Sequence, residues 1–313
     1  MCRAVEPAPS ALDVTVVIPS YRSSRALHKC LEAVTAQRTR LRFEVIVVHS
    51  GTEPVAEDVR SRFATVRFYT IEDRWLPGKA RNWALGKACS PWVLFLDSDC
   101  VVGVDWMETM VSSAIAQAAD GVGGSIRNAT SWNVLAWAMH LLEFGEWLPG
   151  GRPGFRTNFP SCNALYKRSV LLQNAGFPED LFPCEDTVLN YVLCKKGYVL
   201  WFAPECVAGH IHHKDVVGLI EHNHRHGRAY GQACLTYDLP GRFLLHLNPV
   251  LAVLIIVPVR FVRIVLRLIC GHLELLPVLF AGTLPMLASL VAWGVGFVEA
   301  RTRLRSGVWG ARA

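Results

Sequence analysis

The chain has 313 residues, a formal net charge of +6 and a hydrophobic content of 51%. This length allows one large domain or a domain with an appendage, and the hydrophobic content lies above that of an ordinary soluble enzyme. The excess falls in residues 243–298, and arginines cluster near the C-terminus. Because aromatic and basic residues are not interleaved, the charge argues against nucleic-acid binding and favours the anionic cytoplasmic face of a membrane.

Ten cysteines are scattered along the chain, and no two of them form a CxxC pair. Most lie within apolar runs, which indicates buried free thiols in a reducing compartment and disfavours a zinc site. The first 13 residues lack the apolar core of a signal peptide, so the catalytic part is expected to stay in the cytosol.

Strand and helix signals alternate through the first 120 residues. Apolar runs predict strands over residues 14–18, 43–48, 66–71 and 92–96, and helices are predicted at about 25–37, 54–63, 78–88 and 105–118. This order predicts a parallel sheet with right-handed crossovers. No GxGxxG follows the first strand, which disfavours a dinucleotide-binding fold.

The fourth predicted strand runs directly into two carboxylates, Asp97 and Asp99. Its continuous apolar run suits a strand buried on both faces, and such strands end at the sheet edge where open α/β folds bind ligands. Mg²⁺ and Mn²⁺ prefer oxygen ligands and often bridge a carboxylate to substrate phosphates. The pair therefore predicts a site for a metal and a nucleotide, and the alternative is that one acid only caps the next helix.

A second acidic pair, Glu185 and Asp186, opens a predicted helix in the second half of the chain. Acids at a helix start are stabilised by the free N–H groups and the macrodipole, so capping is one interpretation. The other is a general base, a carboxylate that takes the proton of an incoming hydroxyl. A donor and an acceptor would then meet between the two acidic pairs.

Histidines are concentrated in residues 209–226, among them His210 and His212. On an extended segment these two rings share a face, and neutral imidazole is a competent ligand for Mn²⁺ or Zn²⁺. The following helix, predicted over 215–235, carries Arg225 and Arg228 on one face. These guanidinium groups either clamp a diphosphate or lie on lipid headgroups.

The C-terminal region reads as membrane-associated. Residues 243–259 are apolar but interrupted, and Arg260, Arg263 and Arg267 follow at helical spacing, as in an interfacial helix. Residues 275–298 carry few polar groups and are long enough to cross a bilayer, with Pro277 and Pro285 as expected kinks. We expect one interfacial segment and one span or re-entrant hairpin; the alternative is a buried core helix.

Seven segments, in order, resemble the family 2 inverting glycosyltransferases, which have the GT-A nucleotide-diphospho-sugar transferase fold. They are VVIPSYRSSRALHKCLEAV, PGKARNWAL, FLDSD, GFPED, EDTVLNYVLCKKGY, APECVAGHIH and HRHGRAYG, and the resemblance covers about residues 14–230. Where the family usually carries an acid after the second strand, this chain has His49. The resemblance therefore leaves the nucleotide base open, with Glu53 as a nearby substitute.

The resemblance implies a role for each matching residue. Asp186 would be the catalytic base with Glu185 as its neighbour, Asp99 would coordinate Mn²⁺ or Mg²⁺, and His210 or His212 would complete the metal shell. Asp97 would sit by the ribose or base. The other implied donor contacts are Pro19, Tyr21 and Arg22 at the nucleotide, Lys79 and Arg81 near the phosphates or sugar, and Arg228 at the leaving diphosphate.

These observations together predict an α/β protein with a mixed, Rossmann-like GT-A sheet over residues 1–240 and a hydrophobic helical region over 241–313. The predicted activity is metal-dependent transfer of a sugar, with inversion, from a nucleotide-diphospho-sugar donor to a hydroxyl of a glycan or lipid-linked acceptor. The expected location is the cell membrane, with the catalytic domain on the cytoplasmic side. The alternatives are a nucleotidyltransferase of similar fold and an inactive membrane scaffold.

Overall fold

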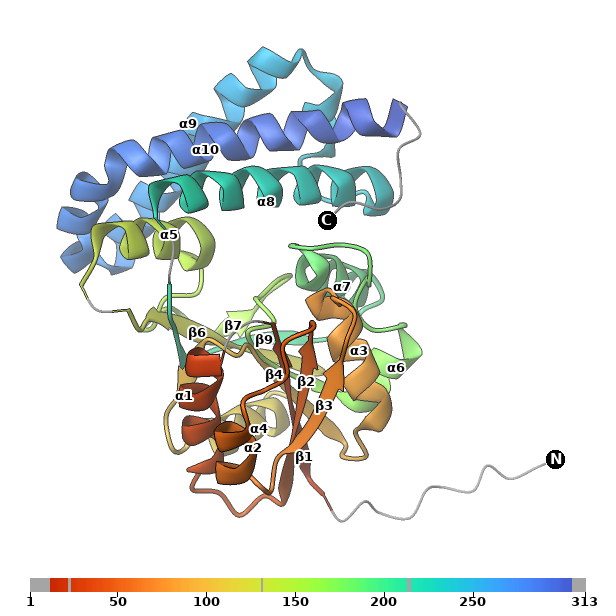
Figure 1. The fold of residues 1–313 in the computed structure, drawn as a ribbon. Coiled ribbons are helices and arrows are strands. Elements are labelled where there is room, and N and C mark those ends of the chain that lie inside the picture. Colours follow the sequence, from red (N-terminus) through yellow and green to blue (C-terminus); the bar gives the residue numbers. More distant parts are fainter. Residues whose placement is uncertain (1–11, 22–23, 131, 213–214, 306–313) are drawn as a thin grey trace.

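The computed structural model describes residues 12–21, 24–130, 132–212 and 215–305. Within them a nine-stranded mixed sheet has the strand order β3-β2-β1-β4-β8-β6-β9-β5, and β7 pairs with β9 (Figure 1). The predicted order of the first half is confirmed. Strands β1 (Val14–Ser20), β2 (Phe43–Ser50), β3 (Arg67–Ile71) and β4 (Trp92–Leu96) are parallel and are joined through α1 (Ser24–Thr35), α2 (Glu57–Arg62) and α3 (Pro77–Lys87).

The second half makes the sheet mixed, because β8 pairs antiparallel with both β4 and β6. Its strands are β5 (Cys100–Val102), β6 (Gly121–Asn128), β7 (Gly154–Phe155), β8 (Asn163–Lys167) and β9 (Leu200–His210). Its helices are α4 (Trp106–Ala116), α5 (Val134–Phe144), α6 (Arg168–Gln173) and α7 (Glu185–Lys195). This arrangement brings the ends of β4 and β9 to the same region as the start of α7.

The apolar runs are strands buried on both faces, as the sequence predicts. In β4, Leu94 and Leu96 pack on the side covered by α1 and α4, while Val93 and Phe95 pack on the side covered by α3, α6 and α7. All four side chains are fully buried. Helices therefore cover both faces of the sheet, and ligands are expected at the ends of its strands.

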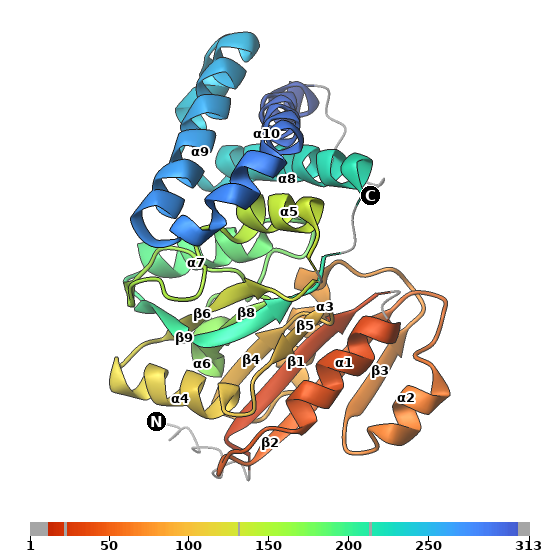
Figure 2. The ribbon, with the colours of Figure 1, turned by 90° about the vertical axis from the view of Figure 1, so that its left-hand side faces the viewer.

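A helical layer lies over the sheet edge (Figures 1 and 2). It consists of α8 (Val216–Tyr237), the short helix η1 (Arg242–His246), α9 (Pro249–Gly271), η2 (Leu273–Leu275) and α10 (Leu276–Arg305). Helix α10 lies directly on α8: a Cβ atom on Gly227 would lie 1.9 Å from the Trp293 carbonyl oxygen, and one on Gly296 would lie 2.1 Å from that of His224. Only glycine permits this approach, so α10 is held closely to the catalytic half.

Two expectations for the C-terminal region are corrected: the interrupted apolar segment at residues 243–259 and the re-entrant hairpin at residues 275–298. Helix α9 is a continuous helix that begins at Pro249, where Asn248 caps it through bonds from the N–H groups of Val250 and Leu251. Helix α10 continues through Pro285, which rules out a re-entrant hairpin within residues 275–298. The ranges Pro249–Gly271 and Leu273–Arg301 are each long and apolar enough to cross a membrane, and only 17% and 33% of their most apolar windows are buried.

Candidate active site

The two acidic pairs converge, and Arg81 of α3 joins them. Its guanidinium donates to Asp97 Oδ1 at 2.6 Å, at the end of β4, and to Glu185 Oε1 at 2.5 Å, at the start of α7. The Arg81 side chain is only 2% exposed. Burial disfavours its charge, but the two carboxylates more than offset this and hold the pKa of Arg81 above its usual value. The chain thus fixes both pairs around one buried cation.

A cavity of about 1030 Å³ opens between this sheet edge and the helical layer. Asp97, Asp99, Glu185 and Asp186 all line it. Within each pair the two acids differ: Asp97 and Glu185 are bound to Arg81, while no ion pair engages Asp186 among the described residues. The pairing leaves Asp99 and Asp186 as the acids available for chemistry.

Asp186 is held by backbone groups from two segments. Its Oδ2 accepts from the Ser161 N–H at 3.0 Å, and its Oδ1 accepts from the Thr187 N–H at 2.7 Å. Cys184 occupies the N-cap position of α7 without a side-chain capping bond, and both acids lie in the first turn of the helix. Burial raises the pKa of Asp186, and the Ser161 and Thr187 hydrogen bonds and the nearby Arg81 oppose this only in part. A positioned carboxylate with a raised pKa is what general-base catalysis needs.

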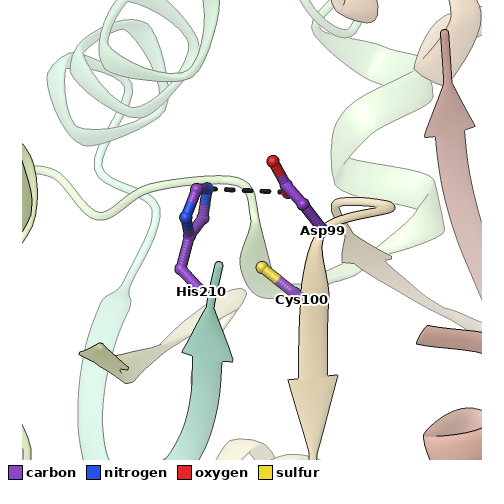
Figure 3. Close-up of side chains that lie close together, drawn as sticks. All are labelled: Asp99, Cys100 and His210. Carbon is purple, nitrogen blue, oxygen red and sulfur yellow. Dashed lines mark ion pairs between the residues drawn. The ribbon is translucent and has the colours of Figure 1, made fainter. Parts of the chain in front are cut away.

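Asp99 and His210 point toward each other in Figure 3, and both line the cavity. His210 Nε2 lies 3.5 Å from Asp99 Oδ1, and the His210 Nδ1 atom is buried and makes no hydrogen bond to any described residue. Burial raises the pKa of Asp99, although His210 opposes this. A carboxylate oxygen and an imidazole nitrogen at this separation fit a divalent cation.

Cys100 lies beside this pair, with its Sγ within 4.8 Å of the Asp99 and His210 ligand atoms. Its hydrogen bond with Cys162 favours the thiolate, but burial and the adjacent carboxylates prevail and raise the pKa of Cys100 to about 12. A thiol binds metal as the thiolate. Mn²⁺ and Mg²⁺ prefer oxygen ligands and Mn²⁺ also accepts imidazole, so Asp99 and His210 are the better candidate ligands and the Cys100 sulfur is the poorer one.

His212 occupies a different position. Its Nε2 lies 3.1 Å from Nδ1 of His140 on α5, whose own Nε2 lies 3.1 Å from the Ile126 carbonyl oxygen. Burial keeps His140 neutral by lowering its pKa to about 4. The structure thus brings His210, rather than His212, to Asp99.

Two of the predicted nucleotide contacts, Pro19 and Tyr21, lie at the end of β1, outside the cavity lining, whereas Asp97 is part of that lining. Pro19 is half-buried, and the Tyr21 ring packs under the Arg74 guanidinium at 5.0 Å. Arg22 lies outside the described residues. His49 is tied down, with Nδ1 3.1 Å from Ser20 Oγ and Nε2 2.7 Å from the Glu53 carbonyl oxygen.

Two predicted basic residues also lie away from the cavity. Lys79 is exposed on α3 and sits 4.7 Å from the Trp75 ring. On α8, Arg225 lines the cavity but Arg228 does not, and the Arg228 backbone lies against α10 at Gly296. The predicted two-arginine clamp is therefore not formed in this conformation.

Several cavity residues carried no clear signal in the sequence. Ser161 acts through its backbone N–H, which no motif reveals. Glu143, at the end of α5, lies 3.5 Å from His222, and an acid within such an apolar helix was the one available hint. Although burial opposes ionisation, the His222 ring holds the pKa of Glu143 below its usual range.

Comparisons with known proteins identify the family of the chain. The family described as Glycosyl transferase family 2 matches residues 15–173, just over half of the chain. Glycosyltransferase AglE of Haloferax volcanii is 27% identical over 202 residues, which is 63% of this chain and 66% of that protein. An N-acetylglucosaminyltransferase of Mesorhizobium japonicum is 27% identical over 230 residues, or 65% of this chain and 51% of that protein. The matches thus span less than two thirds of either relative.

Among solved structures, the mannosyltransferase PcManGT of Pyrobaculum calidifontis, in complex with GDP-Man and Mn²⁺, covers 94% of this chain and 90% of its own. Its TM-score is 0.61 at 19% identity, so this likeness concerns the fold, which is GT-A. The sheet, the converging acids and the family match lead to one conclusion: the chain belongs to glycosyl transferase family 2.

Proposed function

We propose that the protein transfers a sugar from a nucleotide-diphospho-sugar to a hydroxyl acceptor, with inversion at the anomeric carbon. The observation that carries this proposal is the double ion pair of Arg81, which sets Asp99 and Asp186 on one cavity. Family membership and the GDP-mannose and Mn²⁺ bound to the similar archaeal structure support this donor class and a divalent ion.

In this proposal Asp186 removes the proton of the acceptor hydroxyl as its oxygen forms a bond to the anomeric carbon. The bond from that carbon to the nucleoside diphosphate breaks on the opposite face, which inverts the configuration. Mn²⁺ or Mg²⁺ held by Asp99 and His210 would neutralise the charge that develops on the diphosphate. Arg81 holds Asp97 and Glu185 in place through its two ion pairs. Asp97 also lies beside the nucleoside in this proposal. Pro19, Tyr21, Arg22, Lys79 and Arg228 are proposed outer donor contacts, to be completed on donor binding.

We also propose that the helical region, residues 241–313, attaches the catalytic part to the cytoplasmic side of a membrane. The support is the exposed apolar surface of α9 and α10, which in a soluble protein of this size is unusually large. It includes Leu254, Val262, Leu266, Ile269, Phe280 and Leu284. A glycan or lipid-linked acceptor would then reach the cavity from the membrane surface.

The test is a panel of nucleotide sugars, including GDP-mannose, offered to the purified full chain with and without Mn²⁺. We expect one donor class to raise the melting temperature in a metal-dependent way and to release nucleoside diphosphate. An inactive scaffold would release none from any donor, and a nucleotidyltransferase would release pyrophosphate from a nucleoside triphosphate instead. Either outcome would reject the proposal.

A further inference from the structure

Helix α9 carries a basic stripe into the active-site cavity. Arg260, Arg263 and Arg267 recur every three or four residues and so share one face of the helix. All three line the cavity that Asp186 lines. The other exposed residues of this helix are largely apolar, among them Leu254, Val259, Val262, Leu266 and Ile269. The charges are thus placed toward the site, on a helix that is otherwise suited to lipid.

The stripe has more positive charge than its surroundings balance. Arg263 and Arg267 share one carboxylate, that of Glu146, which follows α5. Arg260 lies 4.1 Å over the Trp293 ring, and its Nε atom is shielded from water without a hydrogen bond to any described residue. Arg225 of α8 adds another positive charge to the same lining. A shielded guanidinium without an anionic partner is unfavourable, so the site as it stands is poised for an anion.

Glu146 shows which chemistry the stripe accepts. Two guanidinium groups already hold its oxyanion from one side of the cavity. A phosphate offers the same acceptor geometry with one more oxygen, and arginine forks bind carboxylate and phosphate alike. Arg260, one turn before Arg263, extends the site toward the aromatic and apolar part of the cavity.

We propose that the arginine stripe binds the phosphate group of an amphiphilic acceptor, whose hydrocarbon chain leaves along the apolar surface of α9. This inference rests on the proposed transferase function and specifies its acceptor as a lipid phosphate ester. It explains why the arginines lie within a helix of membrane-spanning length yet line the cavity. The acceptor hydroxyl would then be presented to Asp186 from the membrane side.

The first experiment uses the wild-type full chain in neutral detergent, titrated with dodecyl phosphate, inorganic phosphate or dodecanol. We expect saturable binding of dodecyl phosphate that is at least about tenfold tighter than that of inorganic phosphate, since the chain adds apolar contacts. Dodecanol should not compete. Equal affinity for inorganic phosphate would assign the site to a free anion, and effective competition by dodecanol would remove the role of the arginines. Both results overturn the proposal.

The second experiment changes the charges. The triple variant Arg260→Gln, Arg263→Gln, Arg267→Gln should lose at least about tenfold in affinity for dodecyl phosphate, because charge-assisted hydrogen bonds are lost. The matched control is Arg242→Gln, whose arginine pairs with Asp238 outside the cavity lining. It should bind as the wild type does. A triple variant with unchanged affinity contradicts the inference.

Glu146→Gln keeps the test open if the triple variant fails to fold. It retains every arginine and removes the competing carboxylate, so affinity should rise by about threefold. Unchanged or weaker binding contradicts the inference. Donor turnover by the wild type separates the two proposals. A protein that releases nucleoside diphosphate but does not bind dodecyl phosphate retains the transferase function and loses this acceptor, whereas binding without any donor turnover rejects both the function and the acceptor role.

Discussion

The two walls of the cavity carry opposite charge. On the sheet-edge wall, one buried arginine faces four carboxylates: Asp97, Asp99, Glu185 and Asp186. On the helical wall, Arg225 and the three arginines of the α9 stripe line the cavity with two carboxylates, Glu146, which pairs with Arg263 and Arg267, and Glu143, which lies beside His222. An acidic wall can hold a cation and accept a proton, while a basic wall attracts an anion. The chain thus separates two binding tasks across one cavity.

The four acids of the sheet-edge wall differ in their partners. Asp97 and Glu185 form ion pairs with Arg81, and these pairs fix the positions of the nearby residues in the chain. Asp99 and Asp186 have no arginine partner among the described residues, although His210 lies 3.5 Å from Asp99, and both acids line the cavity. In each acidic pair, therefore, one acid is structural and the adjacent one is free to react.

The strongest way to test this division is to exchange Asp186 for its amide. Asp186→Asn should lower kcat by about 10²–10⁴-fold, because a general base of this kind contributes that much. Its melting temperature should stay near that of the wild type. The control is Asp180→Asn, an exposed acid outside the cavity lining that should keep full turnover. Near-normal turnover by Asp186→Asn would reject its role as the base.

Arg81→Gln tests the structural half of the same division. It leaves Asp97 and the buried Glu185 without their cation, which should cost about 3–5 kcal/mol of unfolding free energy. The matched control is Arg67→Gln, because Arg67 pairs with Glu44 at 2.6 Å but is far more exposed. That change should cost about 1 kcal/mol or less. Denaturant titration of both variants measures the difference, and equal losses would contradict a structural role for Arg81.

The sequence predicted the strand-helix order and the acid positions because both follow from local patterns. The run from Val93 to Leu96 could only be a buried strand, and its end had to meet the other strand ends at the sheet edge. The prediction that the two acidic pairs meet came from their places in the chain, and the structure brings all four acids to one cavity, with Arg81 bridging Asp97 and Glu185. The sequence therefore predicted where the strands end and which residue types follow each strand.

Pairings across the fold could not be predicted. Arg81 matched a motif that implied phosphate contact, but its actual partners come from β4 and α7, which only the tertiary structure brings together. The sequence also did not predict which side of helix α8 faces the cavity. Arg225 and Arg228 lie three residues apart on α8, yet only Arg225 is part of the cavity lining.

The choice between two histidines is a finer test of the acidic wall. His210→Ala should weaken Mn²⁺ affinity by at least about tenfold, because it removes the imidazole beside Asp99. His212→Ala should have a much smaller effect, since the His212 ring is bonded to His140. Calorimetric titration with Mn²⁺ compares them. A greater loss in His212→Ala would reassign the metal shell.

The smallest expected effect is a shift in the pH profile. Burial raises the pKa of Asp186 above the usual 3.8, so the base becomes protonated, and kcat falls, at a higher pH than for an exposed aspartate. The Ser161 hydroxyl lies 3.4 Å from Asp186 Oδ2 and favours the ionised form. Ser161→Ala should therefore raise the acid limb further, by less than about one unit, while the backbone N–H of residue 161 still holds the carboxylate. If the acid limb instead moves to lower pH in this variant, the Ser161 hydroxyl stabilises the protonated form of Asp186. The hydrogen bond from this hydroxyl would then not be one of the interactions that keep the base ionised.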